Sequence, residues 1–221
     1  MRRGRSWISA AALAVCVGVG PASAVERPAT PAEALVFDHA AEHLRAVGVA
    51  VPAFTAAVAD AVACGVDPSD AFEVYACAYP GRVYLTPDAA VDAARYYRSA
   101  RHTRRSTRRV ALGNCGGQCI GVAMAALHEL VHVTRWSVRP VWAADEYPYE
   151  EGLAEAVADD QLSPMMWRVA GLRAQSPGYN YATWVDMARA ATEYDEFLTP
   201  RRTRLVAVMD PRVLFTTEVP S

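Results

Sequence analysis

Two histidines four residues apart constrain this chain of 221 residues more than any other feature. His128 and His132 enclose the pentad His-Glu-Leu-Val-His. Residues at this spacing in an α-helix project from one face, so both imidazoles can bind a single Zn²⁺ ion at about 2.0–2.1 Å each. Glu129 follows the first histidine directly, and a carboxylate there can accept a proton from a metal-bound water. The pentad therefore predicts a metal-binding helix.

A second acidic segment follows this helix. Glu151 comes after a gap of 18 residues and opens the run Glu-Gly-Leu-Ala-Glu, which ends at Glu155. The pentad, this gap and a glutamate on a second helix together resemble the gluzincin metallopeptidases. The likeness is greatest to their aminopeptidase N-type and peptidase MA-like branch, although Pro148 stands where that branch has a tryptophan.

The resemblance implies a role for each of these side chains. His128, His132 and Glu151 would be the ligands of one zinc ion per chain, and Glu129 would be the general base. Glu155, one helical turn beyond Glu151, would hydrogen-bond the outer ring nitrogen of a ligand histidine and fix its tautomer. Three protein ligands leave the fourth zinc position for water, which distinguishes catalytic from structural sites.

Plainer interpretations compete with this one. The two histidines could be ordinary half-buried residues of an amphipathic helix, and the clustered acids could form a solvated helix face. Asp145, Glu146 and Glu150 also lie close to Glu151 in the sequence. The spacing from the histidine pair favours Glu151 as the third ligand.

A peptidase of this kind also needs a donor for the oxyanion that develops during attack on the carbonyl. Tyr179 opens a Tyr-Asn-Tyr-Ala segment that is similar to the family's tyrosine motif, and Tyr149 and Tyr181 are alternatives. The segment that anchors the substrate amino terminus in the aminopeptidases is missing upstream of the pentad. We therefore expect an endopeptidase.

The first 24 residues have the pattern of a secretory signal peptide. Arginines at positions 2, 3 and 5 precede an apolar stretch, and Ala22-Ser23-Ala24 forms a small-residue cleavage site. Removing 24 residues from 221 leaves 197, enough for one catalytic domain over residues 25–221. We expect a secreted or periplasmic protein with no stable membrane anchor after cleavage.

Four cysteines remain after cleavage, which suits an oxidising compartment. Three pairings are formally possible, and pairing of nearest neighbours gives Cys64–Cys77 and Cys115–Cys119. The second bridge would close the Gly-rich turn before the metal helix. A zinc site built on these cysteines is disfavoured because they lack a C-x-x-C spacing and a nearby histidine.

Charge limits the possible partners. Loss of three signal-peptide arginines lowers the formal charge from −2 to −5, which argues against nucleic acid as the main partner. The run from Arg101 to Arg109 is nonetheless strongly basic. It could be a patch for nucleic acid or a membrane surface, or a solvated loop, and the sequence favours the loop.

The hydrophobic pattern predicts an α+β fold that is mostly helical. The gluzincin resemblance implies a zincin-like domain with a small β-sheet beside the active-site helix. We expect helices over residues 30–47, 52–63, 86–100, 117–136, 150–160, 163–173 and 181–194, and strands over 82–86, 109–112, 205–208 and 213–215.

These features together predict a secreted zinc-dependent endopeptidase that acts on peptide or protein substrates. The alternative is a secreted module that binds zinc or peptides without turning them over.

Overall fold

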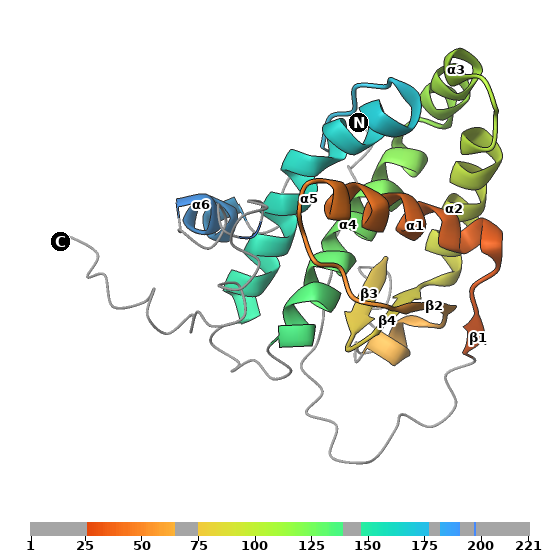
Figure 1. The fold of residues 1–221 in the computed structure, drawn as a ribbon. Coiled ribbons are helices and arrows are strands. Elements are labelled where there is room, and N and C mark those ends of the chain that lie inside the picture. Colours follow the sequence, from red (N-terminus) through yellow and green to blue (C-terminus); the bar gives the residue numbers. More distant parts are fainter. Residues whose placement is uncertain (1–25, 65–74, 139–146, 177–181, 191–196, 198–221) are drawn as a thin grey trace, which may run out of the picture.

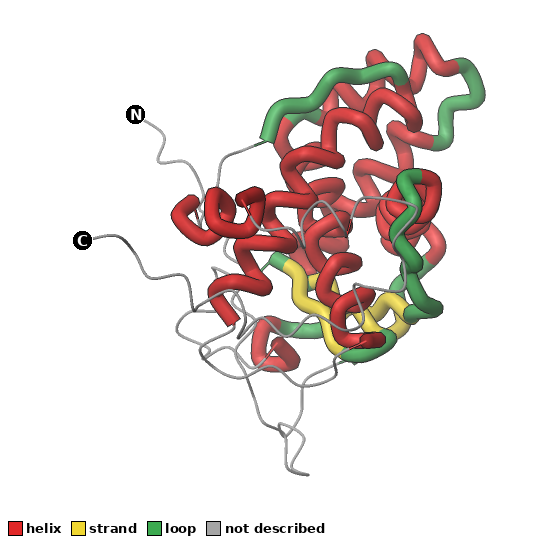
Figure 2. The backbone as a smooth tube through the Cα atoms, turned by 60° about the vertical axis from the view of Figure 1, so that its left-hand side comes forward, coloured by secondary structure: helices red, strands yellow, loops and turns green. Residues whose placement is uncertain are grey.

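A computed structural model describes residues 26–64, 75–138, 147–176, 182–190 and 197. This part of the chain is mostly helical and contains a small mixed sheet of four strands. The strands lie together at one end of the helical body (Figures 1 and 2). The predicted α+β class is therefore confirmed.

One long helix forms the centre of the fold. Helix α4 packs against α1, α2, α5 and the sheet, and α6 lies against α5 (Figure 1). The described helices are α1 (Pro31–Ala46), the 3₁₀ helix η1 (Ala61–Cys64), α2 (Pro87–Ala100), α3 (Arg105–Cys115), α4 (Gly117–Val138), α5 (Tyr147–Ala170) and α6 (Ala182–Ala190).

Threonine caps begin the first two helices. The Thr30 side chain accepts a hydrogen bond from the backbone N–H of Glu33 at 3.3 Å, and the Glu33 carboxylate accepts one from the backbone N–H of Thr30 at 2.7 Å. This capping box satisfies two donors that a helix start leaves without partners. Thr86 caps α2 in the same position before a proline. Both predicted helix starts are confirmed.

The sheet has the order β1-β2-β4-β3. Its strands are β1 (Arg27–Pro28), β2 (Thr55–Val58), β3 (Ala76–Tyr79) and β4 (Arg82–Leu85). Strands β2 and β4 pair in parallel, and the other two pairs are antiparallel. The turn between β3 and β4 places Gly81 at a φ of 71°, a conformation that favours glycine. The strand predicted from residue 82 is confirmed.

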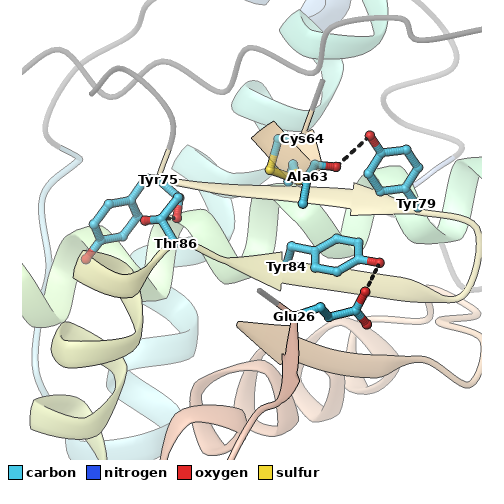
Figure 3. Close-up of a disulfide and its surroundings, with 8 residues drawn as sticks. Glu26, Ala63, Cys64, Tyr75, Tyr79, Tyr84 and Thr86 are labelled. Carbon is cyan, nitrogen blue, oxygen red and sulfur yellow. Dashed lines mark hydrogen bonds between the residues drawn. A yellow bond between two sulfur atoms is a disulfide. The ribbon is translucent and has the colours of Figure 1, made fainter. Parts of the chain in front are cut away.

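Side chains alternate between the two faces of the sheet, as the period of a strand requires. Val83 and Leu85 join the main core beneath α4, whereas Tyr84 and Cys77 join a smaller cluster on the opposite face. The Cys64–Cys77 disulfide ties η1 to β3 on that opposite face (Figure 3).

Two predicted elements are wrong. The helix expected over residues 52–63 is strand β2 followed by η1. Pairing with β1 and β4 outweighs the helix propensity of its alanines, because propensity is weaker than tertiary context. The strand expected at 109–112 and the part of the basic loop from Arg105 onward are helix α3, which buries Leu112.

The two helices expected over residues 150–160 and 163–173 are one helix, α5, with Pro164 inside it. Pro164 is exposed, so its ring enters no packed interface, and buried residues on both sides of it hold the helix together. The helix predicted from residue 181 is α6. The predicted strands at 205–208 and 213–215 lie outside the described residues.

Within the described ranges, no single helix is long and apolar enough to cross a membrane. Helices α3 and α4 pass that test only as a pair, and they are bent by 98° relative to each other. The apolar side chains of α4 belong to the protein core.

Candidate metal centre

The pentad lies on α4, as predicted, and its two imidazoles face each other. His128 and His132 are one helical turn apart, with ring centroids separated by 4.8 Å. Their Nε2 atoms are 3.0 Å apart. Both rings are buried, with 7% and 1% of their residues' surface exposed. The helix therefore directs two potential ligand nitrogens to one point inside the protein.

Glu151 reaches the same point from the first turns of α5. Its Oε2 atom lies 3.2 Å from Nε2 of His128, and its Oε1 atom lies 3.1 Å from Nε2 of His132. The side chain is fully buried. One carboxylate thus contacts both imidazoles, and the three residues offer ligand atoms within 4.8 Å of one another.

The neighbouring acid has a different partner. Glu150 accepts two hydrogen bonds from Arg135, at 2.9 Å from Nε and 2.5 Å from Nη2, and both side chains are buried. Successive helical residues point about 100° apart, so only one of the two adjacent carboxylates can face the histidines. The structure places Glu151 there and uses Glu150 to join α5 to α4. Asp145 and Glu146 lie outside the described residues.

Charge within the buried group is strongly coupled. Burial opposes ionisation of Glu151, but His132 and His128 offset it and hold the pKa of this carboxyl at about 2. Burial likewise opposes protonation of His128, but Glu151, helped by the charges of Glu129 and Glu155, raises its pKa to about 9. The group therefore favours one positive charge between the carboxylate and the rings.

A metal ion fits these residues. The Nε2 atoms of the two imidazoles are 3.0 Å apart. At this distance a proton or a cation must lie between them, because two nitrogen lone pairs that face each other repel. Oε1 of Glu151 is buried and, although it lies 3.1 Å from Nε2 of His132, it accepts no well-aligned hydrogen bond. A cation would satisfy this oxygen. The part of the chain that the structure describes contains no other cluster of three or more such ligand residues.

The two other predicted acids are also buried beside this group. Glu129 is 1% exposed and Glu155 is 4% exposed. The charge of each contributes to the raised pKa of His128, so both lie within electrostatic reach of the ligands. A hydrogen bond from a ligand histidine to Glu155 remains a prediction.

An aromatic support behind His132 was not predicted. The Trp136 ring lies 6.1 Å from the ring of His132 and stacks on Tyr79 of β3, with centroids 5.9 Å apart. The Tyr79 hydroxyl donates to the carbonyl of Ala63 at 3.0 Å (Figure 3). Trp136 follows His132 by four residues, the same spacing as the pentad, and that spacing was the signal available in the sequence.

Both predicted disulfides are present. Cys115–Cys119 joins the end of α3 to the first turn of α4 and encloses the turn at Gly116. Cys64–Cys77 holds η1 against β3, the strand that carries Tyr79. The covalent links thus support α4 at its start and along its packed face. Disulfides of this kind fit an oxidising compartment.

Gly152, directly after Glu151, lets α6 approach α5 closely. A Cβ atom at this position would lie 2.5 Å from Cβ of Trp184 and 2.6 Å from its backbone carbonyl carbon. Only glycine allows this approach. The glycine of the second motif therefore seats α6 beside the residue that faces the histidines.

Of the three tyrosines proposed as oxyanion donors, Tyr149 is the one within the described residues. Tyr149 is buried in the first turn of α5, two residues before Glu151. Tyr179 and Tyr181 lie outside the described residues.

Comparisons with protein-family models, with curated proteins and with solved structures find no match to this chain.

Proposed function

We propose that this protein is a secreted zinc-dependent endopeptidase of the gluzincin type, with a zincin-like catalytic domain. The observation that carries the proposal is the convergence of His128, His132 and Glu151 on one buried point, with Glu129 beside them. The order of these residues along the chain and the 18-residue gap are those of the family that the sequence resembles.

Zinc is the metal that suits this donor set. Two imidazole nitrogens and one carboxylate are common ligands of catalytic Zn²⁺, and three protein ligands leave one position open. A bound zinc ion would polarise the scissile carbonyl and lower the pKa of a water at the open position. The buried ion pair of Arg135 and Glu150 fixes α4 against α5, and thereby holds ligands from two helices in register.

Glu129 is assigned the proton transfers. Its carboxylate would take a proton from the attacking water and deliver it to the amine that leaves. Its position directly after His128 keeps it on the metal helix, and its burial keeps competing solvent away. A tyrosine hydroxyl would donate to the developing oxyanion, with Tyr179 as first candidate and Tyr149 and Tyr181 as alternatives.

Export is part of the proposal. The signal peptide over residues 1–24 would direct the chain to the periplasm or the medium. The two disulfides support this assignment because they persist in oxidising compartments.

The test is peptide cleavage by the purified mature protein, with and without chelator, alongside Glu129→Gln. The wild type should cleave, lose activity to chelator and regain it with Zn²⁺. Glu129→Gln should retain zinc but lose about 10²–10⁴-fold in turnover, because glutamine cannot accept the proton. Glu26→Gln, an exposed change on the sheet, should leave turnover unchanged.

Two results would contradict the proposal differently. Cleavage that survives chelator would remove the metal from the mechanism. Zinc binding without any cleavage would instead favour the alternative, a secreted module that binds zinc or peptides.

A further inference from the structure

Arginines are concentrated in one part of the chain. No aspartate or glutamate occurs between Asp92 and Glu129, and seven arginines do. The segment that follows the middle of α5, residues 161–185, also lacks acids. The chain as a whole is mildly acidic, with a formal charge of −2. Positive charge is therefore segregated within a protein that is negative elsewhere.

The fold brings α3 and the end of α5, one part of each segment, together at one end of the molecule. Helix α3 lies beside the C-terminal end of α5 (Figure 1). Arg105 donates to the carbonyl oxygen of Trp167 at 2.6 Å, and Arg108 donates to that of Val169 at 2.8 Å. These arginines supply partners for carbonyls at the end of α5, where a helix favours cations. The two contacts fix the orientation of α3.

With α3 so fixed, a basic and apolar surface faces solvent. We name it the arginine face: Arg101, Arg104, Arg105 and Arg109, with Trp167 beside Arg105, all exposed. No ion pair to Arg101, Arg104 or Arg109 forms within the described residues. Their charges are thus available to an anionic partner.

The apolar member of the arginine face indicates which partner. Trp167 is 51% exposed, and it is one of four large apolar side chains exposed on the described residues. An indole beside arginines suits the boundary between water and lipid, where aromatic rings settle and phosphates accept from guanidinium groups. The guanidinium of Arg105 covers one face of the Trp167 ring, at 5.5 Å from its centroid. Less of the ring is therefore open to stacking by a nucleic-acid base.

We propose that the arginine face docks the protein peripherally on anionic phospholipid bilayers. The contact is electrostatic with a shallow apolar component. His132 lies fifteen residues along α4 from Gly117, the end of α4 that adjoins α3, or about 22 Å at 1.5 Å per residue. Surface potential decays within about 8–10 Å at physiological salt, so the negative remainder of the protein would not prevent docking.

The experiment is sedimentation of the mature protein with vesicles of phosphatidylcholine, alone and mixed with phosphatidylglycerol. Binding should occur on the mixed vesicles only and weaken as salt is raised. The variant Arg101→Gln/Arg109→Gln should bind about 25-fold more weakly, since each arginine near an anionic surface contributes about 1 kcal/mol, or about 5-fold. Glutamine matches arginine in helix propensity, so α3 should persist, which circular dichroism checks.

A matched control removes the same charge elsewhere. Arg82→Gln/Arg95→Gln alters two exposed arginines of β4 and α2 and should leave vesicle binding within about 2-fold. Trp167→Ser should weaken binding to the mixed vesicles, because the shallow apolar component is lost.

Several results would overturn the proposal. One is equal binding to both kinds of vesicle, or none to either. Another is equal loss in the face variant and its control, which would reduce the effect to net charge. Binding to duplex DNA or heparin as tight as to the mixed vesicles, with Trp167→Ser unchanged, would identify a general polyanion surface instead.

Discussion

The close approach of α6 to α5 at Gly152 predicts an unusual response to alanine. In the interior of a helix, glycine to alanine normally stabilises a protein by about 0.5–1 kcal/mol, because alanine loses less conformational entropy on folding. At Gly152 the added methyl would meet Trp184 at 2.5 Å from its Cβ and 2.7 Å from its carbonyl oxygen. Two of the three nearest atoms belong to the backbone, so no rotamer change of Trp184 relieves the overlap.

The expected magnitude follows from this geometry. Overpacking in a close-packed interface costs about 1–3 kcal/mol, which exceeds the usual gain. Gly152→Ala should therefore lower the free energy of unfolding by about 1–3 kcal/mol, or displace α6 from α5. Urea denaturation of the metal-free protein measures it, with the m-value reporting any loss of cooperative structure.

Gly113 supplies the matched control. It lies within α3, and its Cβ would meet only Cδ1 of Leu172, at 4.0 Å. Gly113→Ala should stabilise the protein by about 0.5–1 kcal/mol. Opposite signs for the two variants are expected. A shift of the same sign and size in both would show that α6 does not lie across Gly152 as described.

Three further predictions concern the buried charges and the aromatic support. Glu151→Gln should weaken zinc binding far more than Glu150→Gln. Glu150→Gln should instead cost the metal-free protein about 3–5 kcal/mol by removing the buried carboxylate that is bonded to Arg135. Titration with zinc and urea denaturation separate the two effects, and equal zinc affinities would refute the assignment. The pKa of Glu33 is lowered to about 2, mainly by its hydrogen bond to Arg27. Its stabilisation is therefore complete above about pH 4.5 and is lost as pH falls toward 2. Glu33→Gln should reduce the loss of unfolding free energy between pH 4.5 and pH 2 by about 1–2 kcal/mol after allowance for solvent screening, and an unchanged pH profile would contradict this. Trp136→Leu should weaken zinc binding about 10-fold, as the loss of other groups that orient metal ligands does. Trp136→Phe keeps an aromatic ring and should retain most of the zinc affinity. Equal weakening in both variants would mean that the ring does not position His132.

The candidate ligand group could be predicted from the sequence because it depends on spacing along the chain. The interval between His128 and His132 is one helical turn whatever surrounds it. Glu151 was preferred to Glu150 because of the 18-residue gap in the family that the sequence resembles, and the structure places Glu151 beside the histidines. The disulfide between Cys115 and Cys119 followed from short separation alone.

The failures share a different cause. Residues 55–58 form a strand because β1 and β4 pair with them. The local sequence of these four residues gives no indication of either neighbour. Helix α3 depends on bonds from Arg105 and Arg108 to the end of α5, sixty residues away in the chain. The buried partner of Glu150, Arg135, is hidden in the same way. Contacts that cross between elements set these features, and propensity is too weak to reveal them.

Elemental analysis measures whether His128, His132 and Glu151 together bind one zinc ion. The purified mature protein is loaded with Zn²⁺ and then dialysed, beside His128→Ala and His132→Ala variants that remain folded. We expect one zinc per chain in the wild type and a large loss in each variant. A wild type that retains no zinc, or variants that retain as much as the wild type, would show that these residues do not form a zinc site.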